Sequence, residues 1–572
     1  MLILLTILLL LTIPAAMLII FLVRPKFSIQ GFLVVLAVFI GWSLVFAAKF
    51  EIPQSLTLLS WQPAAFFPVS PSLLIDDTSW YFALALMSLA LSAVITSIAK
   101  LGQSRKPDNK KIEVIETQTQ SEIDSPVNMP ESSAAVRSTV NWQSWAGILI
   151  ITGIGLVAVT AGNMVTLLLA WAALDLYELF ILLAQELKNI SRERIILSFS
   201  IRMAGIGLVL MAAIIPWSQD ITLSFMSIDY AVTRYLLLAS IFRLGVFPLQ
   251  NHKLQYLNQQ GELNTILRLV ISASSLILIV RVANIGVTGV TSPFILGIAA
   301  LTGLFAGIQW LISSNELQDQ SYWVLGIASL AIASAVLHLP SSTIAWSMAC
   351  LLSGGLLFSM TLRHKNLVLI AFLGIYALSA LPFSPTWLGT DIFNDSDSLS
   401  SILSKPIFYT ISISFLLTFS LFLAGFIRRI LQGILPSEEQ SGFHRERWVW
   451  FLYPIGMFFI LLTHFLIGIM LYPNLDDVPI TGWIVGFVAI LISCLIWYLH
   501  THFFTGLSLG LQPTDGSIDT KLLSHGWINR IFWKFFSATS RITALISSIL
   551  EGDGGILWAF VLFALIFVFL QR

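Results

Sequence analysis

Four charged side chains stand inside long apolar stretches of the sequence: Asp175, Glu178, Arg202 and Arg243. A charge at the centre of a membrane helix costs roughly 2.5–3.5 kcal/mol on insertion scales, so each of them is a candidate for ion translocation. Asp175 and Glu178 are three residues apart and share one face of a helix. We expect Asp175, and less strongly Glu178, to pair with Arg243 across two helices.

The residue types limit the chemistry of such a pair. A guanidinium stays charged in proteins, so Arg243 can bias the proton affinity of a neighbouring carboxylate but is a poor proton carrier itself. Arg202 is expected to be an interior partner near the membrane face. The alternative is that water or hydroxyl groups satisfy Asp175 and Glu178, and that neither carboxylate carries protons.

Gly245 and Pro248 follow Arg243 closely along the chain. Proline lacks the N–H of a helical hydrogen bond, so the helix predicted over 235–249 should kink or break just before Pro248. Pro382 interrupts a second apolar segment in the same way, at the corresponding position of a later part of the sequence. Paired interruptions of this kind are typical of a transport site near the membrane midplane.

The composition predicts an all-α polytopic membrane protein, since 57% of the 572 residues are hydrophobic and only 10% are charged. Soluble domains average about a quarter charged residues. A formal net charge of zero gives no sign of a nucleic-acid partner. Cys350 and Cys494 lie in apolar runs without metal-ligand spacing, and no nucleotide-binding motif is present. We expect no cofactor, no metal site and no redox chemistry within this chain.

Hydrophobic runs predict about 14–16 membrane spans. Lys and Arg gather in alternate loops, which places the N-terminus on the extracytoplasmic side of the membrane. As a separate expectation, the membrane is a bacterial-type plasma or other energy-transducing membrane. The expected organisation is N-terminal spans with an extracytoplasmic hairpin at 1–100, a polar cytoplasmic loop at 101–141, two core regions at 142–285 and 292–430, and C-terminal spans with an amphipathic interfacial helix at 431–572.

Six segments resemble, in the same order, parts of one family: the antiporter-like membrane subunits of respiratory complex I (NADH-quinone oxidoreductase) and of multisubunit sodium/proton antiporters. They fall within residues 50–430 and read PSLLIDDTSWYFALALMSL, NMVTLLLAWAALDLYELFILLAQ, SFSIRMAGIGLVLMAAI, LASIFRLGVFPLQNH, SSNELQDQSYWVLGIASL and LIAFLGIYALSALPFSPTW. The resemblance implies a core of fourteen helices with two inverted five-helix repeats, here 142–285 and 292–430, and helices broken at Pro248 and Pro382.

This sequence departs from the family at its charged positions. The family has a glutamate after the tryptophan of the fifth span, where Ala172 follows Trp171 here. Arg243 stands in place of the lysine of the seventh span, and Gly354 stands at the position of the eleventh-span lysine. No lysine follows Pro382. What remains is one altered acid–base pair in the first core region.

The leading hypothesis is an integral membrane subunit of a complex I-like or multisubunit antiporter-like assembly, involved in proton or sodium translocation through a degenerate channel. One alternative is a non-conducting structural subunit of the same membrane arm. Another is an antiporter-like subunit of an inorganic-carbon uptake system. At most the chain is a non-redox subunit of a translocating NADH/quinone oxidoreductase, and its expected partners are other membrane subunits and the lipid bilayer.

Overall fold

The structure is a computed structural model that describes residues 1–23, 29–58, 69–101, 103–105, 142–185, 189–217, 223–247, 261–287, 291–313, 316–360, 367–393, 405–434, 443–445, 449–471 and 480–499. The chain divides into two compact units, and nearly all described residues belong to the unit formed by 1–246 and 252–498. Pro248, most of the polar loop at 101–141, and the amphipathic helix and last span predicted after residue 500 lie outside the described residues.

Long apolar helices make up almost all of the described chain. The first group comprises α1 (Leu2–Val23), α2 (Ile29–Ala47), α3 (Asp77–Leu101), α5 (Trp142–Val159), α6 (Met164–Gln185), α7 (Asn189–Trp217), α8 (Tyr230–Leu244) and α9 (Gly261–Ala283). The second group comprises α10 (Thr291–Ile312), α11 (Glu316–Val336), α12 (Pro340–Met348), α13 (Gly354–Ser359), α14 (Val368–Leu378), α16 (Lys405–Ile434), α17 (Val449–Leu471) and α18 (Ile480–Leu499).

The short elements lie between these helices. They are the 3₁₀ helices η1 (Ala48–Glu51) and η4 (Trp387–Phe393), and the π-helix η2 (Ala349–Ser353) that joins α12 to α13. Strands β1 (Gln54–Thr57) and β2 (Ser72–Ile75) pair antiparallel within the region where the sequence predicts a hairpin. Strands β3 (Gln103–Arg105) and β4 (Phe443–Arg445) also pair antiparallel.

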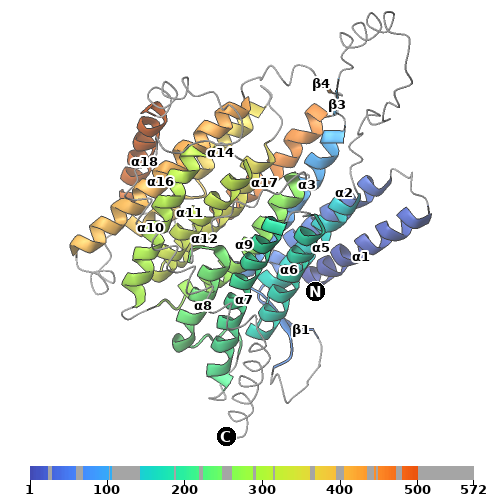
Figure 1. Ribbon diagram of the computed structural model, residues 1–572, viewed down its shortest axis with the longest axis horizontal. Coiled ribbons are helices and arrows are strands. Elements are labelled where there is room, and N and C mark those ends of the chain that lie inside the picture. Colours follow the sequence, from blue (N-terminus) through green and yellow to red (C-terminus); the bar gives the residue numbers. More distant parts are fainter. Residues whose placement is uncertain are drawn as a thin grey trace, which may run out of the picture. The chain divides into compact units, whose positions relative to one another are not determined.

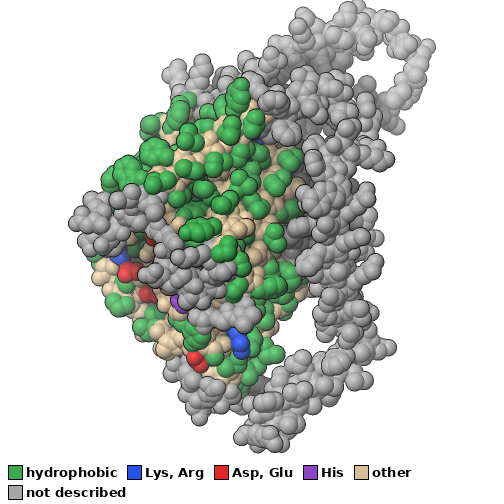
Figure 2. Space-filling view, turned by 90° about the vertical axis from the view of Figure 1, so that its left-hand side faces the viewer, with side chains coloured by type: hydrophobic (Ala, Val, Ile, Leu, Met, Phe, Trp, Pro, Cys, Tyr) green, Lys and Arg blue, Asp and Glu red, His purple; other side chains and the backbone are tan. Residues whose placement is uncertain are grey.

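Twelve of the described helices are long and apolar enough to cross a membrane. Figure 1 shows the long helices running side by side, with α1 and α2 at one side of the described bundle and α16 and α18 at the other. Hydrophobic side chains cover the face in Figure 2, and most of the charged side chains in view lie toward its lower part. These features confirm an all-α, multi-pass integral membrane protein. The inverted repeats stay a prediction.

Helices α8 and α14 both end close to a residue with positive φ, Gly245 after α8 and Ala380 (φ 54°) after α14. Helix α8 ends at Leu244, and Gly245 follows in the left-handed region with φ of 74°, which glycine adopts without steric cost. Helix α14 ends at Leu378, and the turn behind it is held by the Tyr376 hydroxyl, which donates to the carbonyl of Pro382 at 2.7 Å. That proline itself breaks the two helices stays a prediction.

Helices α17 and α18 enclose the turn after α14 through glycines. A Cβ on Gly468 of α17 would lie 2.8 Å from the Cα of Pro385. A Cβ on Gly486 of α18 would lie 2.7 Å from the carbonyl oxygen of Ala380. Both distances are shorter than a side chain permits. The C-terminal helices therefore pack backbone against backbone on the end of α14.

Candidate functional site

Asp175 of α6 and Arg243 of α8 form a doubly hydrogen-bonded ion pair. Arg243 Nη2 donates to Asp175 Oδ1 at 3.0 Å, and Arg243 Nη1 donates to Asp175 Oδ2. Both side chains are 0% exposed. Two parallel N–H···O bonds between a guanidinium and a carboxylate fix the geometry as well as the charge. Sequence reasoning predicted this pairing from the cost of leaving either charge alone in an apolar helix.

Arg202 of α7 joins a second carboxylate to the pair. Its Nη1 donates to Glu178 Oε2, and its Nε lies 3.8 Å from Asp175 Oδ1. Asp175, Glu178, Arg202 and Arg243, hereafter the charged cluster, are all buried and carry two negative and two positive formal charges. Such mutual compensation is what allows four charged groups to stay inside a bundle.

Two uncharged residues position Arg243. The guanidinium carbon lies 4.2 Å from the centroid of the Trp171 ring, a cation–π distance. The Trp171 indole N–H donates to the carbonyl of Ser274 on α9 at 3.3 Å. A Cβ on Gly205 of α7 would lie 2.9 Å from Arg243 Cγ, so only glycine leaves room for the arginine stem. Sequence reasoning missed both roles, although Trp171 precedes Asp175 by one helical turn.

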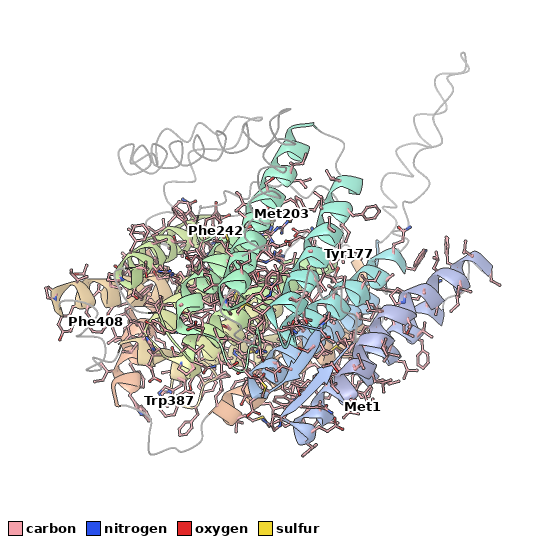
Figure 3. All side chains as sticks on the ribbon, turned by 90° about the horizontal axis from the view of Figure 1, so that it is seen from below. Met1, Tyr177, Met203, Phe242, Trp387 and Phe408 are labelled. Carbon is pink, nitrogen blue, oxygen red and sulfur yellow. The ribbon has the colours of Figure 1, made fainter. Side chains whose placement is uncertain are left out.

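The structure thus brings together all four charged residues predicted from the sequence. Gly245 ends the helix just beyond Arg243, whereas Pro382 lies after α14 in another part of the bundle. Figure 3 shows Tyr177, Met203 and Phe242 of α6, α7 and α8 in one region of the bundle, away from Phe408 of α16. A role of the charged cluster in translocation stays a prediction.

Aromatic side chains occupy the region formed by α10, α11, α13 and α16. The ring centroids of Trp310 and Trp323 lie 5.3 Å apart, and that of Trp323 lies 5.6 Å from Phe426. Phe358 and Phe422 complete this aromatic cluster. A Cβ on Gly354 would lie 2.3 Å from Trp323 Nε1. The position where the family resemblance implies a lysine is therefore filled by an indole ring.

One ion pair borders the aromatic cluster. Arg429 Nη1 donates to Asp319 Oδ2, and the guanidinium carbon lies 4.2 Å from the centroid of a Trp310 ring. Arg429 Nη2 also donates to the carbonyls of Trp310 at 3.2 Å and Ser313 at 3.1 Å. This arginine therefore satisfies carbonyl groups at the C-terminal end of α10, which otherwise lack helical partners.

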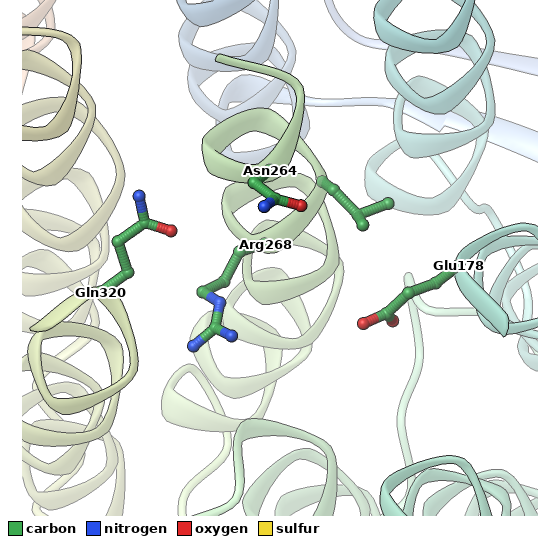
Figure 4. A pocket seen from close by; sticks show the side chains of 5 residues that line it. Glu178, Asn264, Arg268 and Gln320 are labelled. Atoms are coloured by element: carbon green, nitrogen blue, oxygen red, sulfur yellow. The ribbon is translucent and has the colours of Figure 1, made fainter. Parts of the chain in front are cut away.

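A small cavity adjoins the charged cluster between α6, α9 and α11. It is lined by Glu178, Asn264, Leu267, Arg268 and Gln320. Figure 4 shows Glu178 reaching from α6 toward α9, which carries Asn264 and Arg268, with Gln320 on the opposite side. Four of the five lining side chains are polar or charged. Glu178 is therefore the member of the charged cluster that borders this polar space.

Metal-ligand geometry is not found in the described part of the chain, where no three His, Cys, Asp or Glu side chains group around a common point. The described cysteines, Cys350 and Cys494, are both free thiols. What the charged cluster can do follows from its two carboxylates, which can take up and release protons, and its two guanidinium groups, which stay charged.

Comparison with known proteins finds no matching family model. No curated protein matches the sequence either. Solved structures do match in fold. A chain of the Mrp complex from Dietzia sp. DQ12-45-1b superposes with a TM-score of 0.63 at 13% identity, covering 99% of this protein and 62% of that chain. This protein thus spans less than two thirds of the length of that chain.

Two further structures agree. A chain of the membrane-bound sulfane sulfur reductase, an archaeal respiratory membrane complex, gives a TM-score of 0.60 at 14% identity over 99% of both chains. A chain of respiratory complex I from Thermus thermophilus gives 0.54 at 13% identity over 82% of this protein and 98% of that chain. The protein has the fold shared by these membrane subunits, which confirms the predicted resemblance to antiporter-like subunits.

Proposed function

We propose that this protein is a proton-translocating membrane subunit of a multisubunit energy-converting complex, and that the charged cluster is the ionisable site of its path. The observation that carries the proposal is the fully buried, doubly hydrogen-bonded pair between Asp175 and Arg243. Structural neighbours belong to the Mrp complex and to respiratory complexes, which supports membrane partners of the same kind.

The cluster can couple protonation to movement. A guanidinium that lies close to a carboxylate favours the ionised carboxylate, and one that withdraws favours the protonated acid. Arg243 is the last but one residue of α8, two residues before the left-handed Gly245. A small shift at this helix end would loosen the Asp175–Arg243 contact. Asp175 or Glu178 would then take up a proton, and the return of Arg243 would expel it.

A non-conducting structural subunit is the second candidate, and the aromatic cluster around Trp323 favours it. The three atoms nearest to a Cβ on Gly354 all belong to the Trp323 ring. The proposal therefore places translocation in the α6–α8 region alone.

Single and double substitutions of the pair separate the two candidates. Asp175→Asn or Arg243→Gln strands a buried charge and should destabilise the complex by roughly 3–5 kcal/mol. The double variant leaves no charge alone, so it should regain much of that stability. If the proposal holds, the assembled double variant fails to pump protons into vesicles.

The matched control is Arg234→Gln, which removes an exposed arginine from the same helix α8. It should assemble and pump as the parent does. Normal pumping by the stable double variant would establish the structural role instead. Strictly additive stability losses would show that the two side chains do not interact.

A further inference from the structure

The cavity beside Glu178 has the size and polarity of a site for one small polar molecule. The volume within which the centre of a water molecule can lie is about 10 Å³. A water molecule needs roughly 10–15 Å³ by this measure, together with two to four polar partners. The lining side chains of Glu178, Asn264, Arg268 and Gln320 supply such partners from three helices (Figure 4).

The side-chain amide of Asn264 supplies a hydrogen-bond donor to the cavity. The residue is 8% exposed, and its Nδ2 has no hydrogen-bond partner among the described residues. Gln320 Nε2, in contrast, donates to Thr265 Oγ1 at 2.9 Å, and Arg268 Nη1 donates to Ser321 Oγ. A buried amide N–H without a partner is costly. The free Asn264 donor and the Glu178 carboxylate therefore border the same space.

We propose that this cavity binds one water molecule, and that this water exchanges protons with the Glu178 carboxylate. The water accepts a hydrogen bond from Asn264 Nδ2 and donates one to a Glu178 carboxylate oxygen. In proton uptake, a hydronium ion at the site loses one O–H bond, Glu178 gains that proton, and a neutral water remains. Release is the reverse step, and no other reactant is needed.

The surroundings favour water over other occupants. Glu178 is the single carboxylate of the lining, too few ligands to hold a metal cation, and the available space is too small for an oxyanion such as phosphate. The exchange rests on the proposed function, because it matters only if Glu178 carries protons. The presence of the water does not depend on that function.

Leu267 gives a test that changes no charge. It is the only apolar lining residue of the cavity, so Leu267→Phe should fill the space and displace the water. Asn264→Leu should remove the donor while keeping a similar volume, and Asn264→Ser should keep a donor. Leu301→Phe is the control, since Leu301 on α10 is 65% exposed.

The intact complex is imaged by cryo-electron microscopy at a resolution that shows buried waters, and proton pumping is measured in vesicles. We expect a water peak between Glu178 and Asn264 in the parent, Asn264→Ser and Leu301→Phe. It should be missing from Leu267→Phe and Asn264→Leu, whose assembled complexes should pump at least tenfold more slowly.

Two results would overturn the proposal. One is a parent map without a peak in the cavity, although waters are visible elsewhere in the interior. The other is unchanged pumping by Leu267→Phe once its peak is lost. If the parent complex does not pump protons at all, the proposed function fails, whereas the map still decides the water site by itself.

Discussion

Two regions of this protein each contain an arginine that pairs with an aspartate and lies over a tryptophan ring. In the α6–α8 region, Arg243 stacks on Trp171 at 4.2 Å and pairs with Asp175. In the α10–α16 region, Arg429 stacks on Trp310 at 4.2 Å and pairs with Asp319. The proposed ion path uses only the first of these two triads, so the difference between them must lie in their surroundings.

The neighbours of each triad make the difference. Arg243 bonds to a carboxylate whose other neighbour is a second arginine, and a further acid, Glu178, borders a polar cavity. Arg429 directs Nη2 to backbone carbonyls at the end of α10, beside packed aromatic rings. The first triad has a spare titratable group close to polar space. The second is engaged in closing a helix.

The largest expected effect tests the second triad. Arg429→Gln leaves the Asp319 carboxylate, 0% exposed, without its cation and should destabilise the complex by roughly 3–5 kcal/mol. Adding Asp319→Asn should restore part of that loss. Pumping per assembled complex should match the parent in both variants, as measured in vesicles normalised to complex content. Loss of pumping in the stable double variant would place an ion path in this region too.

The next effect concerns the filled lysine position. Gly354→Ala places a Cβ 2.3 Å from Trp323 Nε1, and overpacking of this kind costs roughly 1–3 kcal/mol. Gly297→Ala on α10 is the control, because a Cβ there meets nothing within 4 Å. Thermal unfolding of the purified complex compares the two. Equal stability would mean that the aromatic cluster yields easily and that its packing does not exclude a side chain.

Gly205→Ala asks the same question of the charged cluster. Its Cβ would lie 2.9 Å from Arg243 Cγ and 3.0 Å from the carbonyl oxygen of Ala239. We expect a stability loss of roughly 1–2 kcal/mol together with slower pumping, because Arg243 must shift away from Asp175. Gly207→Ala, with open space around it, should leave both unchanged. Slower pumping in both variants would show that helix α7, and not the arginine, is sensitive.

The smallest effect concerns Asp391 in η4, outside the spanning helices and without an ion pair to another described residue. Burial raises the pKa of its carboxyl from 3.8 to about 6. Its contribution to stability is therefore complete below pH 3.8 and is lost as the pH rises through about 6. Asp391→Asn should add on the order of 1 kcal/mol at neutral pH and flatten the pH dependence of thermal unfolding. Asp229→Asn, at the start of α8, should leave that dependence in place.

Sequence reasoning reached the Asp175–Arg243 pair because burial cost forces isolated charges in apolar helices to find partners. The same rule was not applied to Asp319 and Arg429, which are 110 positions apart in the sequence. The Trp310–Phe422 contact could not be predicted from the sequence, because it depends on the rotation of two helices about their axes. Apolar periodicity predicts where a helix lies in the sequence, but it does not predict which aromatic side chains of two helices come into contact.

The space around individual atoms could not be predicted from the sequence either. Gly205 and Gly207 cannot be told apart in the sequence, yet a Cβ on Gly205 would press on Arg243 and a Cβ on Gly207 would meet nothing within 4 Å. The cavity beside Asn264 arises where three helices from different parts of the chain fail to close completely. Such gaps are properties of the assembled bundle.

The glycines that surround the end of α14 bear on how the protein is made. The carbonyl of Ala380 meets Gly486, and Pro385 meets Gly468, about a hundred residues further along the chain. During synthesis, the turn after α14 enters the membrane well before either helix that covers it. Until those helices arrive, this side of the turn is exposed to lipid, water or an insertion factor. Completion of this part of the bundle therefore waits for α18, and a ribosome that stops before Gly486 releases a chain with an uncovered helix end.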